Sequence, residues 1–423
     1  MKVVQISTWD ANGGAARAAA RLHLGLRAID VNSEMIVYDQ SSTLPGVHRF
    51  APVRTLRRRA ERYLFRKRGI DRCIPLHWPR FEDFSIERCQ WGADLVGQLQ
   101  PYDLVNLHFV KGMFDYRNFF AQIAGQIPLV WTLHDMNPFT GGCHYDDACG
   151  RFTAGCGACP QLQSTNEKDL SREIWQRKQH AFSHLPDSQL TIVTPSRWLG
   201  EECGRSSLLG RFRVETIPYG LDLEQYQPRD WTVIRQLLDI PESAFVVLAL
   251  AQHFKHHRKG FAHIVELIKQ LGSEDNIYFL LVGAPPTSEF VASSRVRCLS
   301  PNSDDRFLSF IYSSADLFVM PTLADNLPNT VMESMACGTP VVAFNVGGIP
   351  DMVQNGKTGV LVTLGDGAAL AHAIRNLRQN PEQLHEMARA SRAMAAGEFP
   401  LERQAKQYQE LYEQILLSAS RGQ

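Results

Sequence analysis

Residues 316–346 read DLFVMPTLADNLPNTVMESMACGTPVVAFNV, in which two short apolar runs flank a longer amphipathic one. The apolar runs, residues 316–322 and 340–346, are typical of buried β-strands, whereas residues 329–338 have a helical pattern that ends at Gly338. Strands that are apolar on both faces belong to parallel sheets covered by helices. The stretch therefore predicts a strand–helix–strand unit of an open α/β sheet.

The same alternation of apolar and amphipathic segments extends along the chain. Further strands are predicted at residues 2–7, 34–39, 103–108, 128–134, 189–196, 245–251 and 276–283. A chain of 423 residues exceeds the usual size of one core, so two domains are expected. Pro218, Gly220 and Pro228 punctuate the stretch between the two series of strands. We predict an α/β fold with two doubly wound domains over residues 1–217 and 218–400, followed by an amphipathic helix over residues 401–423 that could pack on either domain.

The composition of the chain limits which binding partners and which cellular compartment are expected. Forty-four Lys and Arg balance forty-four Asp and Glu, so no overall charge favours nucleic acid. No apolar run is long enough to span a membrane, and the amino terminus reads as a strand without a signal-peptide core. The nine cysteines are an odd number in a long chain, which is not the pattern of a secreted disulfide framework. These features predict a cytoplasmic protein.

Two carboxylates flank the predicted helix start. Asp325 lies in the loop after the strand, and Glu333 lies one turn into the helix. Ligands of open parallel sheets bind beyond the carboxyl ends of the strands, and the first N–H groups of a helix attract anions. The helix begins with Asn329, Thr330 and Val331, and either of the first two can serve as its cap. This arrangement suits a nucleotide sugar, with its diphosphate between two sets of hydroxyls. The alternative is a surface Asp and a Glu that only complements the helix dipole.

Basic residues and glycines lie at corresponding places after two other strands. Arg258 and Lys259 precede Gly260, which opens a helix, and a lysine there can neutralise a diphosphate. Gly347 and Gly348 follow the strand at residues 340–346, where a backbone without side chains can approach a ligand closely. The second half of the chain therefore combines acidic, basic and glycine positions at one predicted sheet edge.

This ordered series resembles the motif E-x-x-P-x-x-x-x-E-(A/S)-x-A-x-G-x-P-V-(V/I)-A of the retaining, nucleotide-sugar-dependent glycosyltransferases of family 4. The matching positions are Asp325, Pro328, Glu333, Ser334, Ala336, Gly338, Pro340, Val341, Val342 and Ala343, preceded by a Lys-Gly pair and followed by Gly-Gly. The resemblance implies a GT-B architecture, in which two Rossmann-like domains face a central cleft and the C-terminal domain holds most of the donor. Two positions depart from the family pattern: Asp325 replaces a Glu, and His253 stands where an Arg is often found.

The resemblance extends into the first half. Gly13 and Gly14 lie between the first strand and the first helix, where the family brings a glycine-rich backbone against phosphate and acceptor. His134 ends the strand at residues 128–134, like the cleft histidine that the family turns toward the donor sugar. A core histidine is the alternative reading of His134.

The resemblance also implies a mechanism. In front-face attack the acceptor hydroxyl passes its proton to the departing phosphate, and no side-chain nucleophile is required. Lys259 and the helix start would stabilise the leaving diphosphate, with Arg258 or Lys255 helping because His253 replaces the arginine. Asp325, Glu333 and His134 would orient the substrates. No two aspartates stand two residues apart, as they do in the Asp-x-Asp metal site of the other major glycosyltransferase fold. Catalysis without a required metal or other cofactor is therefore expected.

Four cysteines cluster after the strand that ends at His134. Cys143, Cys149, Cys156 and Cys159 have the spacing C-x5-C-x6-C-x2-C, and four thiolates could close a tetrahedral structural zinc site. Free thiols are the alternative, because the first two spacings exceed the usual two to four residues. A similar loop is found in the capsule- and colanic-acid-type branch of the family, which favours an exopolysaccharide pathway.

A basic segment, residues 54–69, carries eight basic residues and one acidic residue among apolar ones. As a helix it could rest on the anionic inner leaflet of a membrane, where a lipid-linked acceptor would be found. The alternative is a solvated surface segment.

The predicted function is the transfer of a sugar from a nucleotide-diphosphate sugar to a saccharide or lipid-linked saccharide in exopolysaccharide, capsule or lipopolysaccharide biosynthesis. A GT-B nucleotide-sugar epimerase or phosphorylase is the alternative among enzymes. A zinc-stabilised module that binds a partner without chemistry is the alternative outside them, although it leaves Asp325 and Glu333 without a role. A nucleic-acid partner is not expected.

Overall fold

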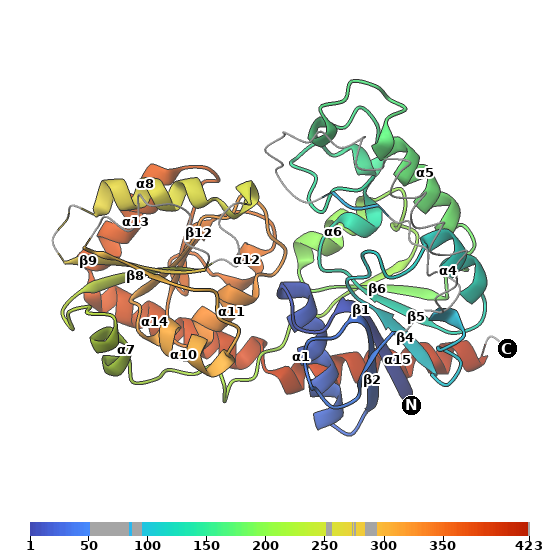
Figure 1. Ribbon diagram of the computed structural model, residues 1–423, viewed down its shortest axis with the longest axis horizontal. Coiled ribbons are helices and arrows are strands. Elements are labelled where there is room, and N and C mark those ends of the chain that lie inside the picture. The colour runs from blue at the N-terminus through green and yellow to red at the C-terminus, as the bar shows by residue number, and fades with distance from the viewer. Residues whose placement is uncertain are drawn as a thin grey trace. The chain divides into compact units, whose positions relative to one another are not determined.

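The structure, a computed structural model, describes residues 1–50, 84–86, 95–250, 256–272, 274, 276–283 and 294–421. The chain forms two compact units, one of Met1–Ile217 with Gln404–Gln423 and the other of Pro218–Arg403 (Figure 1). The predicted basic segment at 54–69 and His253 lie outside the described residues. None of the helices in the described ranges is both long and apolar enough to cross a membrane.

The N-terminal unit is built on a parallel sheet with the strand order β3-β2-β1-β4-β5-β6-β7. Its strands are β1 (Lys2–Trp9), β2 (Asn32–Asp39), β3 (Val47–Arg49), β4 (Leu104–Leu107), β5 (Leu129–Thr132), β6 (Leu190–Thr194) and β7 (Arg213–Thr216). The helices that connect them include α1 (Gly14–Ala28), α4 (Tyr116–Ile123), α5 (Leu170–Phe182) and α6 (Arg197–Arg205). The central strands β4, β5 and β6 are buried along their whole length, as the apolar runs predict.

The C-terminal unit has a second parallel sheet with the order β10-β9-β8-β11-β12-β13. The strands are β8 (Phe245–Leu250), β9 (Ile277–Val282), β10 (Val296–Leu299), β11 (Leu317–Met320), β12 (Val341–Phe344) and β13 (Gly359–Val362). Its helices include α7 (Thr232–Leu237), α8 (Phe261–Leu271), α10 (Asp305–Ser313), α11 (Asn329–Ala336), α12 (Ile349–Met352), α13 (Gly367–Gln379) and α14 (Pro381–Glu398). Figure 1 shows α8 and α10 on opposite sides of this sheet, so helices cover both of its faces.

The last helix, α15 (Leu401–Arg421), belongs to the N-terminal unit from Gln404 onward. Its apolar face joins the core formed by the first sheet, in which Tyr408 and Tyr412 pack with Val3, Leu104 and Val130. Both tyrosines are fully buried, and a buried hydroxyl needs a hydrogen-bond partner. The Tyr412 hydroxyl accepts from Asn106 Nδ2 at 2.9 Å, and the Tyr408 hydroxyl lies 2.9 Å from Thr132 Oγ1. The chain therefore returns to its first domain after completing the second.

Each unit is an open parallel α/β sheet with helices on its faces. The predicted fold class, with two Rossmann-like domains, is thus confirmed.

Candidate active site

The candidate site of the C-terminal unit lies at the carboxyl ends of β8, β11 and β12. Lys259 follows β8, Asp325 follows β11, and Gly347 follows β12. Because these neighbouring strands are parallel, the three loops meet at one edge of the sheet.

The loop after β8 is fastened to the loop after β11. The carbonyl oxygen of Arg258 accepts from Leu323 N at 2.7 Å and from Thr322 Oγ1 at 3.0 Å. Gly260 has a φ of 67°, and a Cβ at this position would lie 1.6 Å from the carbonyl oxygen of Pro321. Only glycine permits this approach, because it has no Cβ and tolerates a positive φ. The backbone on either side of Lys259 is therefore held in place.

Lys259, Asp325 and Arg258 form one ion cluster. Asp325 Oδ2 accepts from Lys259 Nζ at 2.7 Å and from Arg258 Nη1 at 3.3 Å. Burial alone would raise the pKa of Asp325, but Lys259 and Arg258 hold it below its ordinary value. The Lys259 side chain is 32% exposed and that of Asp325 only 11%. Lys259 is thus the more accessible member of this pair, and the carboxylate is largely buried.

Helix α11 begins at this cluster. Its cap is Pro328, not Asn329 or Thr330, so the predicted cap was wrong. Proline fixes φ near the observed −67°, which leaves its backbone extended just before the helix. Proline has no side-chain acceptor, and no other side chain in the described residues caps α11. The start of α11 therefore has no side-chain cap, while the Val331 N–H donates to the Pro328 carbonyl oxygen at 3.0 Å.

Glu333 lies on the second turn of α11 and is only 2% exposed. One of its carboxylate oxygens accepts from the Tyr312 hydroxyl, on α10, at 3.0 Å. Burial and the adjacent Glu333 charge raise the pKa of Tyr312 well above its ordinary value, so this hydroxyl remains a donor. Tyr312 was not predicted as a site residue.

The two glycines after β12 contact the backbone of Asp325. Gly347 has a φ of 57°, and a Cβ here would lie 2.0 Å from the Asp325 carbonyl oxygen. The same oxygen accepts from Gly348 N at 3.1 Å. The structure therefore brings together Arg258, Lys259, Asp325, Gly347 and Gly348, with Glu333 on the helix that follows.

The N-terminal unit carries its own polar cluster at the carboxyl ends of its strands. His134, just beyond β5, lies with Nε2 3.1 Å from Nδ1 of His108, which follows β4. His108 Nε2 lies 2.9 Å from Gln5 Oε1, on β1. Burial lowers the pKa of His134 to about 4, so its imidazole is neutral at pH 7. His108 ends a predicted strand, so the rule that singled out His134 could also have found it.

A second set of contacts adjoins His134. His144 Nδ1 lies 2.7 Å from Asp135 Oδ2, and its Nε2 lies 2.7 Å from Ser85 Oγ. Ser85 comes from a distant part of the chain, and the three residues have no spacing that sequence reasoning could use. Gly13 is the N-cap of α1 with a φ of 89°, and Gly14 is the first residue of that helix. No atom lies within 4 Å of a Cβ built on Gly13, so the helix start has open space beside it.

The four predicted metal-ligand cysteines are brought together in the N-terminal unit. Cys143, Cys149, Cys156 and Cys159 all border one cavity of about 10 Å³, and all four are free thiols.

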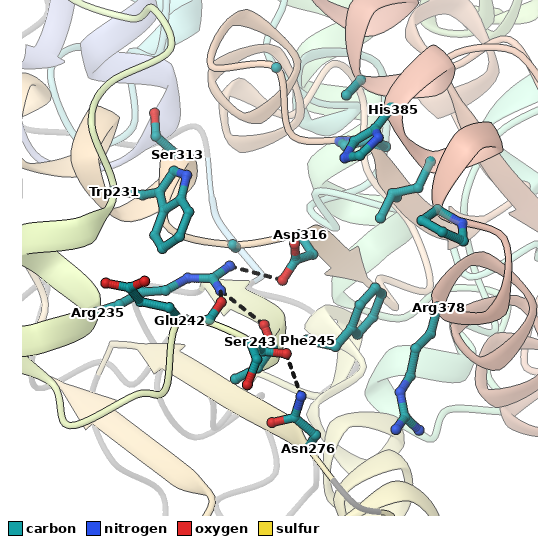
Figure 2. A pocket seen from close by; sticks show the side chains of 17 residues that line it. Trp231, Arg235, Glu242, Ser243, Phe245, Asn276, Ser313, Asp316, Arg378 and His385 are labelled. Carbon is teal, nitrogen blue, oxygen red and sulfur yellow. Dashed lines mark hydrogen bonds and ion pairs between the residues drawn. The ribbon is translucent and has the colours of Figure 1, made fainter.

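A cavity of about 570 Å³ opens at the amino ends of the strands in the C-terminal unit, opposite the candidate site. Figure 2 shows Arg235 directed at Asp316 within it. Arg235 donates to Asp316 and to the carbonyl oxygens of Ser314, Glu242 and Ala244. Its guanidinium is thus engaged in holding the protein together, and Arg378, which also lines this cavity, pairs with Glu274.

Comparison with known proteins shows what the C-terminal unit is similar to. Residues 244–380 match the family model of the group 1 glycosyl transferases. This segment contains Lys259, Asp325, Glu333 and both glycines after β12. The segment of this chain that is similar to group 1 glycosyl transferases therefore lies in the C-terminal unit.

Particular relatives carry the names of such enzymes. The D-inositol 3-phosphate glycosyltransferase of Rhodococcus jostii is 31% identical over 191 residues, which are 42% of this chain and 42% of that enzyme. The enzyme of the same name from Nocardia farcinica is 29% identical over 75% of this chain and 68% of its own length. The match to the Rhodococcus relative thus spans less than half of that enzyme. Among solved structures, Anabaena HepE in complex with UDP has a TM-score of 0.67 at 17% identity and covers 98% of this chain and 100% of its own. This likeness shows the fold alone, which is GT-B.

Proposed function

We propose that this protein transfers a sugar, with retention of anomeric configuration, from a nucleotide-diphosphate sugar to a saccharide or lipid-linked saccharide. The observation that carries the proposal is the Lys259–Asp325–Arg258 cluster beside the start of α11, which no side chain caps. Positive charge beside a helix N-terminus at one sheet edge suits a diphosphate. The match to the group 1 glycosyl transferases supports the same reading.

Each acidic residue is proposed to bind a different part of the donor. The diphosphate lies against Lys259 and the first turn of α11, from Asn329 to Val331. Asp325 accepts hydrogen bonds from sugar hydroxyls, and Glu333 accepts them from ribose hydroxyls. Carboxylates suit both tasks, since an ionised carboxylate is an acceptor only and a hydroxyl can donate to it.

Transfer of the sugar requires stabilisation of the departing nucleoside diphosphate. Negative charge grows on the diphosphate as the glycosidic bond breaks, and Lys259 with the α11 N–H groups is positioned before the reaction to oppose it. The acceptor hydroxyl gives its proton to the departing phosphate, so neither a side-chain nucleophile nor a metal is required. His134, neutral at pH 7, orients the sugar through a hydrogen bond.

The similar proteins and the Cys-rich loop support particular classes of donor and acceptor. HepE was solved with UDP, which favours a uridine diphosphate donor. The Cys-rich loop favours an exopolysaccharide, capsule or lipopolysaccharide acceptor. The names of the Rhodococcus and Nocardia relatives make a phosphorylated polyol the second candidate acceptor.

Calorimetry with UDP, GDP and ADP tests the donor site directly. In Lys259→Ala we expect the preferred nucleotide to bind about 10- to 100-fold more weakly, the effect of removing a charge-assisted hydrogen bond. Lys269→Ala, on the exposed face of α8, is the matched control and should bind like the wild type. Equal affinity in both variants would remove Lys259 from the site.

A donor screen by mass spectrometry separates the candidate functions. Wild-type protein, nucleotide sugars and lipid extracts should yield a glycosylated product in buffer without divalent cations. Loss of donor without a product would favour an epimerase, whereas sugar phosphate formed from glycan and phosphate would favour a phosphorylase. Binding of an oligonucleotide without any turnover would favour the non-enzymatic module.

A further inference from the structure

The loop between β5 and α5 gathers four cysteines around one small cavity. Its walls include Phe84, Gly141 and the cysteines Cys143, Cys149, Cys156 and Cys159. At about 10 Å³, the cavity has room for one ion or one water-sized sphere and no more. Three of the cysteines are buried, and Cys149 is half-buried.

A hydrogen-bond donor is directed at one of the sulfur atoms. Gly141 N donates to Cys156 Sγ at 3.1 Å. Such a donor favours the thiolate over the thiol, and the thiolate is the form that binds metals.

Positive charge lies beside the same thiols. Lys178, which is fully buried, donates to the carbonyl oxygens of Asn137 and Thr140, and its charge acts on Cys156. The Arg151 side chain lines the cavity itself. A divalent ion with four thiolates carries two negative charges, so nearby cations would offset part of the cost of burying it.

Without an ion, burial keeps the four thiols protonated. Burial raises the pKa of each thiol, that of Cys156 to about 12. A bound divalent cation reverses this balance, because it deprotonates a coordinating thiol.

As the side chains lie, no group of three or more Cys, His, Asp or Glu in the described residues is arranged to hold a metal ion. Binding therefore requires the thiols to turn inward. A change of χ1 rotamer redirects a cysteine sulfur without moving the backbone. All four side chains already border the same cavity, so rotation about these single bonds is the movement needed.

From this juxtaposition we propose that Cys143, Cys149, Cys156 and Cys159 bind one structural zinc ion. Four sulfur ligands close the tetrahedral shell and leave no position for substrate, so the ion would act on stability and not on the reaction. The loop it fastens carries His144, which contacts Asp135 and Ser85 near His134. The ion would thus hold the loop next to the strand end that bears His134.

The full-length protein, expressed with added zinc and purified without chelators, tests this proposal by elemental analysis. We expect about one zinc ion per chain, released when a mercurial reagent titrates the thiols. Cobalt(II) in place of zinc should give the visible absorption of tetrahedral cobalt thiolate. These readouts do not depend on glycosyl transfer, so the metal site can fail while the proposed function stands.

Two serine variants provide the comparison. Cys149→Ser should lose most of the zinc and the cobalt absorption, and should melt at a lower temperature than the wild type. Cys298→Ser, an exposed cysteine of the other unit, should keep both. Three results for the wild-type protein would overturn the proposal: the absence of metal, iron in place of zinc, or disulfides among the four cysteines. So would equal zinc content in the two variants.

Discussion

Asp325 divides its two carboxylate oxygens between two tasks. Oδ2 accepts from Lys259 and Arg258, whereas Oδ1 accepts from its own neighbour, Asn326 N, at 3.1 Å. A shorter side chain than the Glu of the family motif stays close to the backbone, which Gly347 and Gly348 also contact. The position of this carboxylate is therefore set by the loops after β8 and β12 as well as by its own.

The sequence predicted these contacting residues because each follows an apolar strand and fits a motif. It did not predict Tyr312 or Ser85. Tyr312 projects from α10, and Ser85 comes from a stretch far from His144 in the chain, so neither has a spacing that relates it to the site. Such partners are chosen by tertiary packing, which periodicity does not encode.

His134 gives the N-terminal unit a dependence on pH. Its pKa is about 4 in the folded protein, against an ordinary value of 6.5. Between these values the unfolded chain binds a proton that the folded protein does not, so stability is greatest above pH 6.5 and falls as the pH drops toward 4. His108, whose pKa burial lowers well below its ordinary value, contributes in the same direction.

Replacement of His134 by Gln should remove the part of this stability loss at low pH that His134 causes. Between pH 7 and pH 5 we expect the wild type to lose on the order of 1–2 kcal/mol more stability than His134→Gln. Urea unfolding followed by tryptophan fluorescence measures this, because every tryptophan except Trp231 lies in residues 1–217. His372→Gln, on the exposed face of α13, should behave like the wild type, and the same loss in all three proteins would contradict the assignment.

The strands that were not predicted from the sequence all lie at sheet edges. The strands β3, β7, β10 and β13 were not predicted, and each lies at an edge of its sheet. The β7 strand, Arg213–Thr216, has no fully buried residue. An edge strand pairs on one side only and does not need a continuous apolar run. The central strands were predicted because burial on both faces leaves a pattern in the sequence, and partial exposure removes it.

The short connection before α8 depends on Gly260. Alanine there would combine a positive φ with a Cβ 1.6 Å from the Pro321 carbonyl oxygen, so the backbone must move. Gly356 has a φ of 77° and no atom within 4 Å of where a Cβ would lie, so Gly356→Ala measures the cost of φ alone, about 1 kcal/mol. We expect Gly260→Ala to lower the melting temperature more and to weaken nucleotide binding, because Lys259 is displaced. If the two variants melt and bind alike, the contact with Pro321 does not hold the loop.

At the scale of the whole molecule, the chain passes from the first unit to the second near residue 217 and returns near residue 404. The N-terminal unit therefore completes its core only when α15 has been made. The sequence predicted this helix and its apolar face, but amphipathicity shows that a face is buried and not against what. The hydrogen bonds of Tyr408 and Tyr412 to β5 and β4 identify the partner sheet.

Truncation of Tyr412 tests whether α15 stabilises the first unit alone. Tyr412→Ala removes a fully buried ring and leaves Asn106 without this hydroxyl, so we expect a loss of about 3–5 kcal/mol. Hydrogen exchange should accelerate in the strands of the N-terminal unit and remain unchanged in β8, β11 and β12. Leu417→Ala removes an exposed side chain from the same helix and should change neither. Faster exchange in both sheets of Tyr412→Ala would show instead that the two units unfold together, and that α15 supports more than the sheet it covers.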